Sequence, residues 1–151
     1  MESGLCRLID SIPEEILLID SDFRVLDANQ HFLARVGKPK EEVMGQLCYH
    51  VVCGVEHPCT DGDQPCLLSR AFESGETLQG AHRYLCPDGT ERWLAVLYSP
   101  VRDDQGRLTA VLHTARDVTA ERALRRVMES EVHKLQALQH ITMVLSAASD
   151  V

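Results

Sequence analysis

The stretch TLQGAHRYLCPDGTERWLAVLYSPVRDDQGRLTAVLHTARDV (77–118) decides the fold. It contains three long segments that suit β-strands, at 77–86, 90–101 and 107–118. The segments are joined by PDG (87–89) and DDQG (103–106), and the Pro, Asp and Gly of these joints are residues that tight turns prefer. We therefore predict three neighbouring antiparallel strands connected as a meander.

Two shorter strands are predicted upstream of this meander. ILLID (16–20) is an apolar run, SD (21–22) suits a turn, and FRVLDA (23–28) partly alternates between apolar and polar residues, which together predict a hairpin. The chain then has five strands in all, and short helices must cover one face of their sheet. The sequence thus predicts an α+β domain built on a five-stranded antiparallel sheet.

Short helices are predicted between the strands from apolar spacing and from capping residues. Asn29 suits the start of a helix and Gly37 its end, and Gly75 closes another. The segment 48–66 has two prolines, two glycines and little periodicity, so we expect it to be largely loop. The predicted helical segments are 5–12 before Pro13, 29–36, a turn near 40–45, and LLSRAFESGE (67–76).

After Val118 the pattern becomes that of one long helix, with Thr119 as a suitable N-cap. Seven positions follow a 4-3 spacing and five of them are apolar, which predicts a coiled-coil seam. A lone amphipathic helix packed back on the domain is the alternative. The seam positions are Leu124, Met128, Glu131, Leu135, Leu138, Thr142 and Leu145.

Composition narrows the class of protein. The 151 residues carry a formal net charge of −8, which argues against a nucleic-acid surface, because phosphate contacts need clustered Lys and Arg. The sequence has neither a run of about 20 apolar residues nor a secretory signal, so we expect a cytoplasmic protein without membrane contact from this segment. A nucleophile–base set, a Walker loop and an HExxH motif are all missing, so no enzyme is predicted.

Two short motifs resemble those of the PAS family. DG-x-x-R-W at Asp88, Gly89, Arg92 and Trp93 is similar to the hairpin between that family's third and fourth strands, and RDVTAER (116–122) is similar to its closing signature. The resemblance covers about residues 5–122. It implies a sensory module of a histidine kinase, a diguanylate cyclase or a transcriptional regulator, which acts on an output domain of the same polypeptide.

The resemblance also implies a division of the chain and a dimer. Residues 1–13 would form an N-terminal capping helix, 14–118 the PAS domain, and 119–151 a signalling helix or coiled-coil linker through which two copies pair. The tail LQALQHITMVLSAASDV (135–151) is similar to the opening helix of a GAF domain. Signals would pass from the last strand to this helix, with Asp117 anchoring the junction and Thr119 capping the helix.

Four cysteines within nineteen residues carry the unusual chemistry: Cys48, Cys53, Cys59 and Cys66. Their loop resembles the CY-x-V-x-x-G…PC-x-x-CPL loop of a cysteine-bearing subset of PAS domains, although the last pair here is C-x6-C and proline precedes Cys66. Thiolates suit zinc and iron–sulfur clusters. Related cysteine-bearing PAS sensors detect oxygen through an iron–sulfur cluster, so the resemblance implies redox sensing.

Other readings of the same residues stay open. His50 and His57 are alternate ligands for zinc or haem, and Cys59 with Cys66 is a candidate thiol–disulfide switch. The cysteines also suit small, partly buried apolar positions without special chemistry. A haem or another organic ligand in the sheet cavity, with His50, His57 or His113 as axial ligand, and a ligand-free dimerisation module are the remaining alternatives. For His113 itself we expect a packed or solvent-facing side chain.

Overall fold

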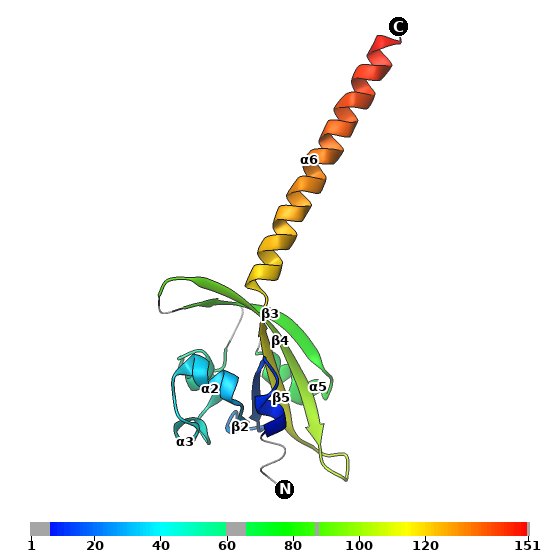
Figure 1. The fold of residues 1–151 in the computed structure, drawn as a ribbon. Coiled ribbons are helices and arrows are strands. Elements are labelled where there is room, and N and C mark those ends of the chain that lie inside the picture. Colours follow the sequence, from blue (N-terminus) through cyan, green and yellow to red (C-terminus); the bar gives the residue numbers. More distant parts are fainter. Residues whose placement is uncertain (1–6, 60–65, 87, 151) are drawn as a thin grey trace. The chain divides into compact units, whose positions relative to one another are not determined.

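The computed structural model describes residues 7–59, 66–86 and 88–150. The chain forms two compact units, residues 1–117 and residues 118–151. In the first unit a run of short helices separates the two strands β1 and β2 from the three strands β3, β4 and β5, and the second unit is the single helix α6 (Thr119–Ser149). The elements of the first unit are β1 (Glu15–Ile19), β2 (Val25–Ala28), α2 (Gln30–Val36), α3 (Lys40–Val43), α4 (Cys48–Val52), α5 (Leu67–Ser74), β3 (Leu78–Leu85), β4 (Glu91–Arg102) and β5 (Leu108–Asp117), as Figure 1 shows.

The five strands form one antiparallel sheet in the order β2-β1-β5-β4-β3. The strand that comes last in the sequence, β5, is therefore the central one. It pairs on one side with β1, where Glu15 lies opposite Ala115, and on the other with β4, where Tyr98 lies opposite His113. The predicted sheet and the predicted meander are confirmed.

Both meander turns use the chemistry that the sequence indicates. Asp88 Oδ1 accepts a hydrogen bond of 2.9 Å from Thr90 N in the first turn. In the second turn, Asp103 Oδ1 accepts hydrogen bonds of 2.9 Å from the backbone N of Gln105 and of Arg107. The turns thus fix the register of β3, β4 and β5 locally, because each Asp carboxylate accepts hydrogen bonds from backbone N–H groups in its turn.

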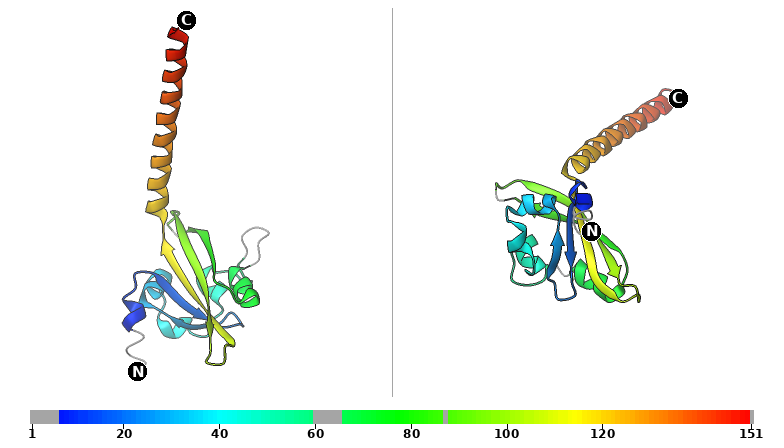
Figure 2. Two further views of the ribbon diagram at one scale, coloured as in Figure 1. Left: turned by 90° about the vertical axis from the view of Figure 1, so that its right-hand side faces the viewer. Right: turned by 60° about the horizontal axis from the view of Figure 1, so that its bottom comes forward.

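The short helices lie together on one face of the sheet (Figures 1 and 2) and enclose the core against it. Phe32 from α2, Leu17 from β1 and Leu68 from α5 are the largest fully buried side chains. Each contributes about 1.5–3 kcal/mol through removal of its apolar surface from water. The helices are too short to be stable alone, so this packing is what holds them in place.

Asn29 ties α2 to the strands beside it. Its side chain is wholly buried. Oδ1 accepts hydrogen bonds from Phe32 N at 3.1 Å and from Ile16 N at 2.9 Å, and Nδ2 donates to Glu14 O at 2.8 Å and to Ile9 O at 3.1 Å. The predicted N-cap is confirmed, and it also joins the N-terminal segment to β1.

The segment 48–66, predicted to be largely loop, begins instead with the helix α4. Cys48 N donates to Phe23 O at 2.7 Å, and Tyr49, Val51 and Val52 pack against the core. Tertiary packing thus makes a helix where periodicity is weak. Of the predicted N-terminal helix, residues 7–10 are helical and Leu5 lies outside the described residues, as do 60–65 of the loop.

The second unit is a helix of 31 residues. Its N-cap is Val118, which makes no side-chain capping bond, so Thr119 is the first helical residue and not the predicted cap. The five apolar seam residues, Leu124, Met128, Leu135, Leu138 and Leu145, are each between 60% and 63% exposed. Among the described residues, none of the helices combines the length and the apolar character that crossing a bilayer demands.

Candidate functional site

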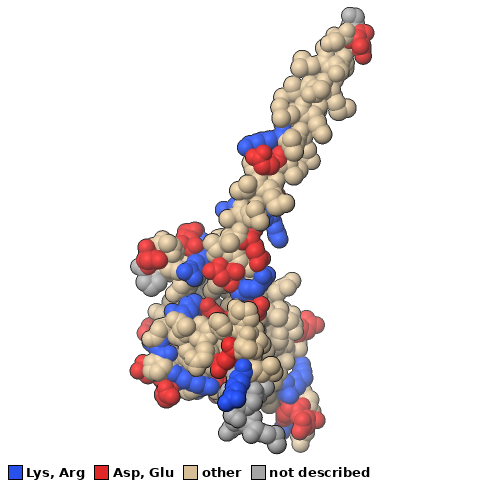
Figure 3. All heavy atoms as spheres, in the orientation of Figure 1, with Lys and Arg blue, Asp and Glu red and all other residues tan. Residues whose placement is uncertain are grey.

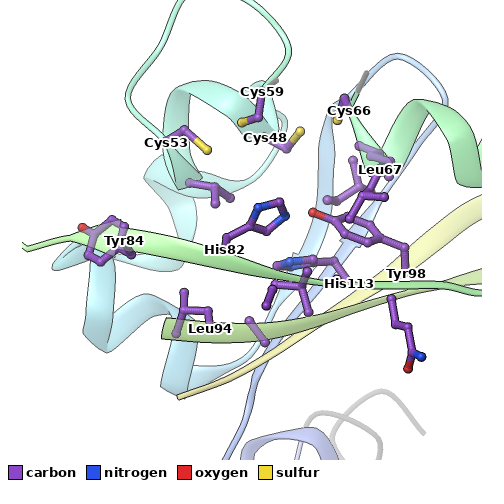
Figure 4. A pocket seen from close by; sticks show the side chains of 18 of the residues that line it. Cys48, Cys53, Cys59, Cys66, Leu67, His82, Tyr84, Leu94, Tyr98 and His113 are labelled. Atoms are coloured by element: carbon purple, nitrogen blue, oxygen red, sulfur yellow. The ribbon is translucent and has the colours of Figure 1, made fainter. Parts of the chain in front are cut away.

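A cavity of about 540 Å³ lies between the inner face of the sheet and helices α4 and α5. We call it the cysteine-lined cavity, because all four loop cysteines line it (Figure 4). Its volume falls in the range of sites for small organic molecules, about 300–1,000 Å³. Its apolar walls include Ile19, Val52, Leu67, Leu68, Leu94 and Val96, and its polar lining includes Arg35, His82, Tyr84, Tyr98 and His113.

The ends of the two short helices bring the cysteines together. Cys48 is the first residue of α4 and Cys53 is its C-cap, whereas Cys66 is the N-cap of α5. Cys59 lies in the loop that follows α4. Cys48 is buried, Cys53 is exposed, and Cys59 and Cys66 are partly buried. The four thiols therefore differ in access to solvent although they share one cavity.

Burial and hydrogen bonding also separate the thiols in acidity. Burial raises the pKa of Cys48 to about 12. A hydrogen bond from the Cys59 thiol lowers the pKa of Cys53 to about 7, and the same bond, together with burial, raises the pKa of Cys59. Near neutral pH, Cys53 is thus the one of these three thiols with a substantial thiolate fraction.

The described residues do not fit a metal centre. A zinc or iron–sulfur site needs several deprotonated ligands that converge, and among residues 7–59, 66–86 and 88–150 no group of three or more His, Cys, Asp or Glu is so arranged. The alternates also lie elsewhere. His50 Nε2 is 3.3 Å from Glu56 Oε2, and His57 Nδ1 is 3.2 Å from Pro58 O. The metal site stays a prediction.

His113 is the buried polar residue of the cavity wall. It lies in the middle of β5, is 4% exposed and has its ring centroid 4.8 Å from that of Tyr98. Its Nδ1 has no hydrogen-bond partner among the described residues. Burial lowers the pKa of His113 to about 3, so the ring is neutral at physiological pH. The ring is packed, but it also lines the cavity, which the sequence did not lead us to expect for His113.

Three further lining residues escaped the sequence analysis: Arg35, His82 and Tyr98. For His82 the signal was present, because alternate residues of β3 face the helices and His82 shares that face with Gly80 and Tyr84. Tyr98 likewise shares a face of β4 with Leu94 and Val96. Nothing near Arg35 in the sequence indicates its position.

Arg35 lies at the end of the cavity among aromatic rings and a carboxylate. Its guanidinium is 5.2 Å from the centroids of both the Phe32 and the Tyr84 rings, a spacing typical of cation–π contacts. Its Nε is 2.7 Å from Glu15 Oε1 in an ion pair that is largely buried. Burial raises the pKa of Glu15, while Arg35 opposes that shift.

A second hollow, of about 830 Å³, shares Arg35 and Tyr84 with the cavity. It is also lined by Glu15, Arg92 and Asp117. Arg92 Nη1 is 3.6 Å from Asp117 Oδ2 at the end of β5. We call these four charged residues, Glu15, Arg35, Arg92 and Asp117, the charged cluster. It includes Asp117, the residue predicted to anchor the junction with the helix.

Comparison with known proteins identifies the family. A sequence model of the PAS fold matches residues 9–123. The chain belongs to the PAS family. This PAS chain is 29% identical over 116 residues to the biofilm dispersion protein BdlA of Pseudomonas aeruginosa, an alignment that covers 77% of the chain. The chain spans about a quarter of BdlA, because the alignment covers 27% of that protein.

Solved structures show the same PAS fold. An RNA-binding light-oxygen-voltage receptor superposes with a TM-score of 0.66 at 24% identity, over 93% of this chain and 38% of the receptor. VqmA of Vibrio cholera, solved as a complex with ligand and DNA, superposes with a TM-score of 0.62 at 20% identity, over 79% of this chain and 52% of VqmA. At these identities the likeness establishes the fold alone.

Family membership gives the PAS chain a general role. PAS domains are regulatory sensor modules that commonly dimerise and sit in multidomain signalling proteins. Fold membership does not determine the signal that such a module senses. The signal must therefore be argued from the cavity and its side chains.

Proposed function

We propose that this chain is a sensory module that binds a small organic molecule in the cysteine-lined cavity and signals through the end of β5. The observation that carries the proposal is the buried ring of His113, whose Nδ1 lacks a partner among the described residues beside a cavity of about 540 Å³. A buried polar group without a partner costs about 1–3 kcal/mol. A ligand that hydrogen-bonds to Nδ1 would recover part of that cost.

The lining favours an uncharged and mainly apolar ligand. Leu67, Leu94 and Val96 supply apolar walls, and the neutral ring of His113 offers a hydrogen bond without a charge. Three arginines also line the cavity, and two of them are already paired, Arg35 with Glu15 and Arg83 with Glu91. An anionic ligand at either of these two would have to compete with a carboxylate, so we favour a molecule with one hydrogen-bonding group near His113.

The charged cluster offers a route from the cavity to the end of β5. Arg35 lines the cavity, is paired with Glu15 and shares the second hollow with Asp117. A ligand that displaces Arg35 would change the electrostatic environment of Glu15, and with it that of Asp117. A few kcal/mol of difference between two arrangements is enough for a switch, provided that the ligand prefers one of them.

Helix α6 would receive the signal as part of a homodimer. It follows β5 directly in the chain and exposes the apolar seam that runs from Leu124 to Leu145. In Figure 3 its C-terminal half shows mostly uncharged side chains, whereas basic and acidic side chains intermingle on the visible face of residues 1–117. The partner that best suits this seam is the α6 helix of a second copy, because the 4-3 spacing matches the pattern of coiled coils.

Ligand binding can be tested directly. We expect native mass spectrometry of the purified protein to show a bound small molecule that solvent extraction releases. Gly80→Val should abolish the adduct, because a Cβ at Gly80 would lie 2.8 Å from Leu67 Cδ1 and force that side chain into the cavity. Ala95→Val, on the neighbouring strand and outside the cavity lining, adds the same kind of bulk and should retain the adduct.

Anaerobic purification with an absorption spectrum and metal analysis separates the alternatives. A Soret band would indicate haem, for which His113 is the axial candidate that lines the cavity. Iron with sulfide, or zinc, would support the cysteine-ligated site and its redox role in place of the organic ligand. A colourless, metal-free protein without any adduct would overturn the proposal in favour of a ligand-free dimerisation module.

A further inference from the structure

Cys53 and Cys59 are brought together by a short loop that is fastened to α4. The backbone N of Cys53 and that of Val55 both donate to Tyr49 O at 3.2 Å. Further along the loop, Glu56 Oε2 lies 3.3 Å from His50 Nε2 on α4. These contacts turn the chain back on the helix, and the Cys59 thiol donates its hydrogen bond to Cys53. The two sulfur atoms are thus neighbours before any oxidation.

The surroundings distinguish this pair from the other thiols of the cavity. Cys53 is exposed and can meet a dissolved oxidant, whereas Cys48 is buried. In Figure 4 the sulfur atoms of Cys53 and Cys59 point toward each other at the rim of the cavity. The lowered pKa of Cys53 is consistent with its role as the attacking thiol, because the thiolate is the reactive form.

We propose that Cys53 and Cys59 are an oxidation site, in which hydrogen peroxide oxidises Cys53 and Cys59 then closes an intramolecular disulfide at the cavity rim. This site goes beyond the proposed ligand binding and does not depend on it. It also differs from the pair predicted from the sequence, Cys59 with Cys66.

The chemistry balances with peroxide as the oxidant. The Cys53 thiolate attacks one peroxide oxygen, the O–O bond breaks, and with one proton taken up the products are a sulfenic acid and water. Cys59 sulfur then attacks Cys53 sulfur, the S–O bond breaks, and the Cys59 proton leaves with the hydroxide as a second water. Two thiols lose two electrons in total and one peroxide gains them.

The disulfide would act on the cavity because both residues line it. It would close a small ring from Cys53 to Cys59 and fix the loop between them.

Peptide mapping tests the proposal. The reduced 151-residue chain is treated with equimolar hydrogen peroxide, blocked with N-ethylmaleimide and digested with trypsin and Glu-C. Cleavage after Glu56 separates Cys53 from Cys59, so the disulfide appears as a linked pair of peptides that dithiothreitol releases. We expect Cys53→Ser and Cys59→Ser each to abolish the linked pair, and Cys48→Ser, Cys66→Ser and Cys86→Ser to retain it.

The outcomes discriminate clearly. Cys59 and Cys66 share the peptide 57–70, so a disulfide between them would appear as a single unlinked peptide in which neither cysteine carries N-ethylmaleimide. That peptide in place of the linked pair would overturn the assignment in favour of the Cys59–Cys66 pair, and absence of any disulfide would overturn it altogether. If a variant fails to fold, the rate of N-ethylmaleimide labelling in the unaltered chain decides instead. Cys53 must then react at least about tenfold faster than Cys48. Ligand binding is measured on reduced protein, so its failure would leave this result standing.

Discussion

Tyr98 and His113 lie directly opposite each other on β4 and β5, with their ring centroids 4.8 Å apart. Leu17 pairs with His113 from the other side, so one row of the sheet runs through the floor of the cavity. Burial raises the pKa of Tyr98 and lowers that of His113. Both side chains therefore stay neutral across the physiological range, and the cavity has an uncharged polar floor.

The neutral state of His113 should make stability depend on pH. Below pH 6.5 the histidine of the unfolded chain takes up a proton, whereas in the folded chain it stays neutral down to about pH 3. The free energy of unfolding should fall as pH is lowered through this window, by at most about 1.4 kcal/mol per pH unit. Urea titrations at several pH values measure this slope.

The matched controls are His113→Leu and His57→Leu. Between about pH 5 and pH 6.5, where ordinary carboxylates titrate little, the first substitution should flatten the slope. The second should leave it unchanged, because His57 is exposed. Equal slopes in all three proteins would contradict the buried, neutral histidine.

The ion pair of Arg35 and Glu15 should be far more costly to break than one at the surface. Arg35→Met leaves a buried carboxylate without its partner, which costs about 3–5 kcal/mol. Adding Glu15→Gln should recover most of that loss. Lys40→Met breaks the pair of Lys40 and Asp27, whose side chains are 38% and 36% exposed, and should cost less than about 1 kcal/mol. Similar losses for Arg35→Met and Lys40→Met in urea denaturation would refute the argument.

Asp117 should affect the response to ligand more than the affinity for it. Asp117→Ala removes the partner of Arg92 at the end of β5, outside the cysteine-lined cavity. We expect the ligand affinity to change less than about twofold, while the ligand-induced change of amide hydrogen exchange at residues 119–130 disappears. Loss of binding itself would count against a relay. Asp27→Ala, at a distant partly exposed ion pair, should alter neither quantity.

The apolar seam of α6 should control dimerisation. Leu135→Glu places a charge at a seam position and should raise the dimer dissociation constant at least about tenfold, equivalent to about 1.4 kcal/mol. Ser130→Glu adds the same charge on the opposite side of the helix and should have little effect. Sedimentation equilibrium measures both variants. A chain that is monomeric at every concentration, or equal behaviour of the two variants, would argue against the homodimer.

Local chemistry made most of the elements predictable. Helix α2 begins after Asn29, whose side chain caps the helix start, and ends at Gly37, which adopts a positive φ of 66°. The aspartates of the two meander turns act in the same local way. Helix α4 was missed because Tyr49 and Val52 are held by distant parts of the chain, which leave no periodic pattern in so short a segment.

The cavity was only partly predictable for a similar reason. The sequence places Cys48, Cys53, Cys59 and Cys66 in one segment, which favours a shared site. Whether they converge as ligands or line a cavity depends on how α4 and α5 are packed. The role of Arg35 depends on packing even more, because its ring and carboxylate partners come from three different elements of the fold.

The central position of β5 in the sheet determines when the domain can fold during its synthesis. Strand β1 is synthesised early, yet its partner on one side arrives about a hundred residues later, where Ala115 meets Glu15. Until then the β1–β2 hairpin has an open edge, and isolated hairpins are marginal in water. A nascent chain must therefore wait for its last strand before the sheet can close, and such long-range pairing makes folding slow. Strand β5 completes the sheet, and α6 follows it in the chain. The helix is therefore synthesised only after all five strands of the sheet have been synthesised.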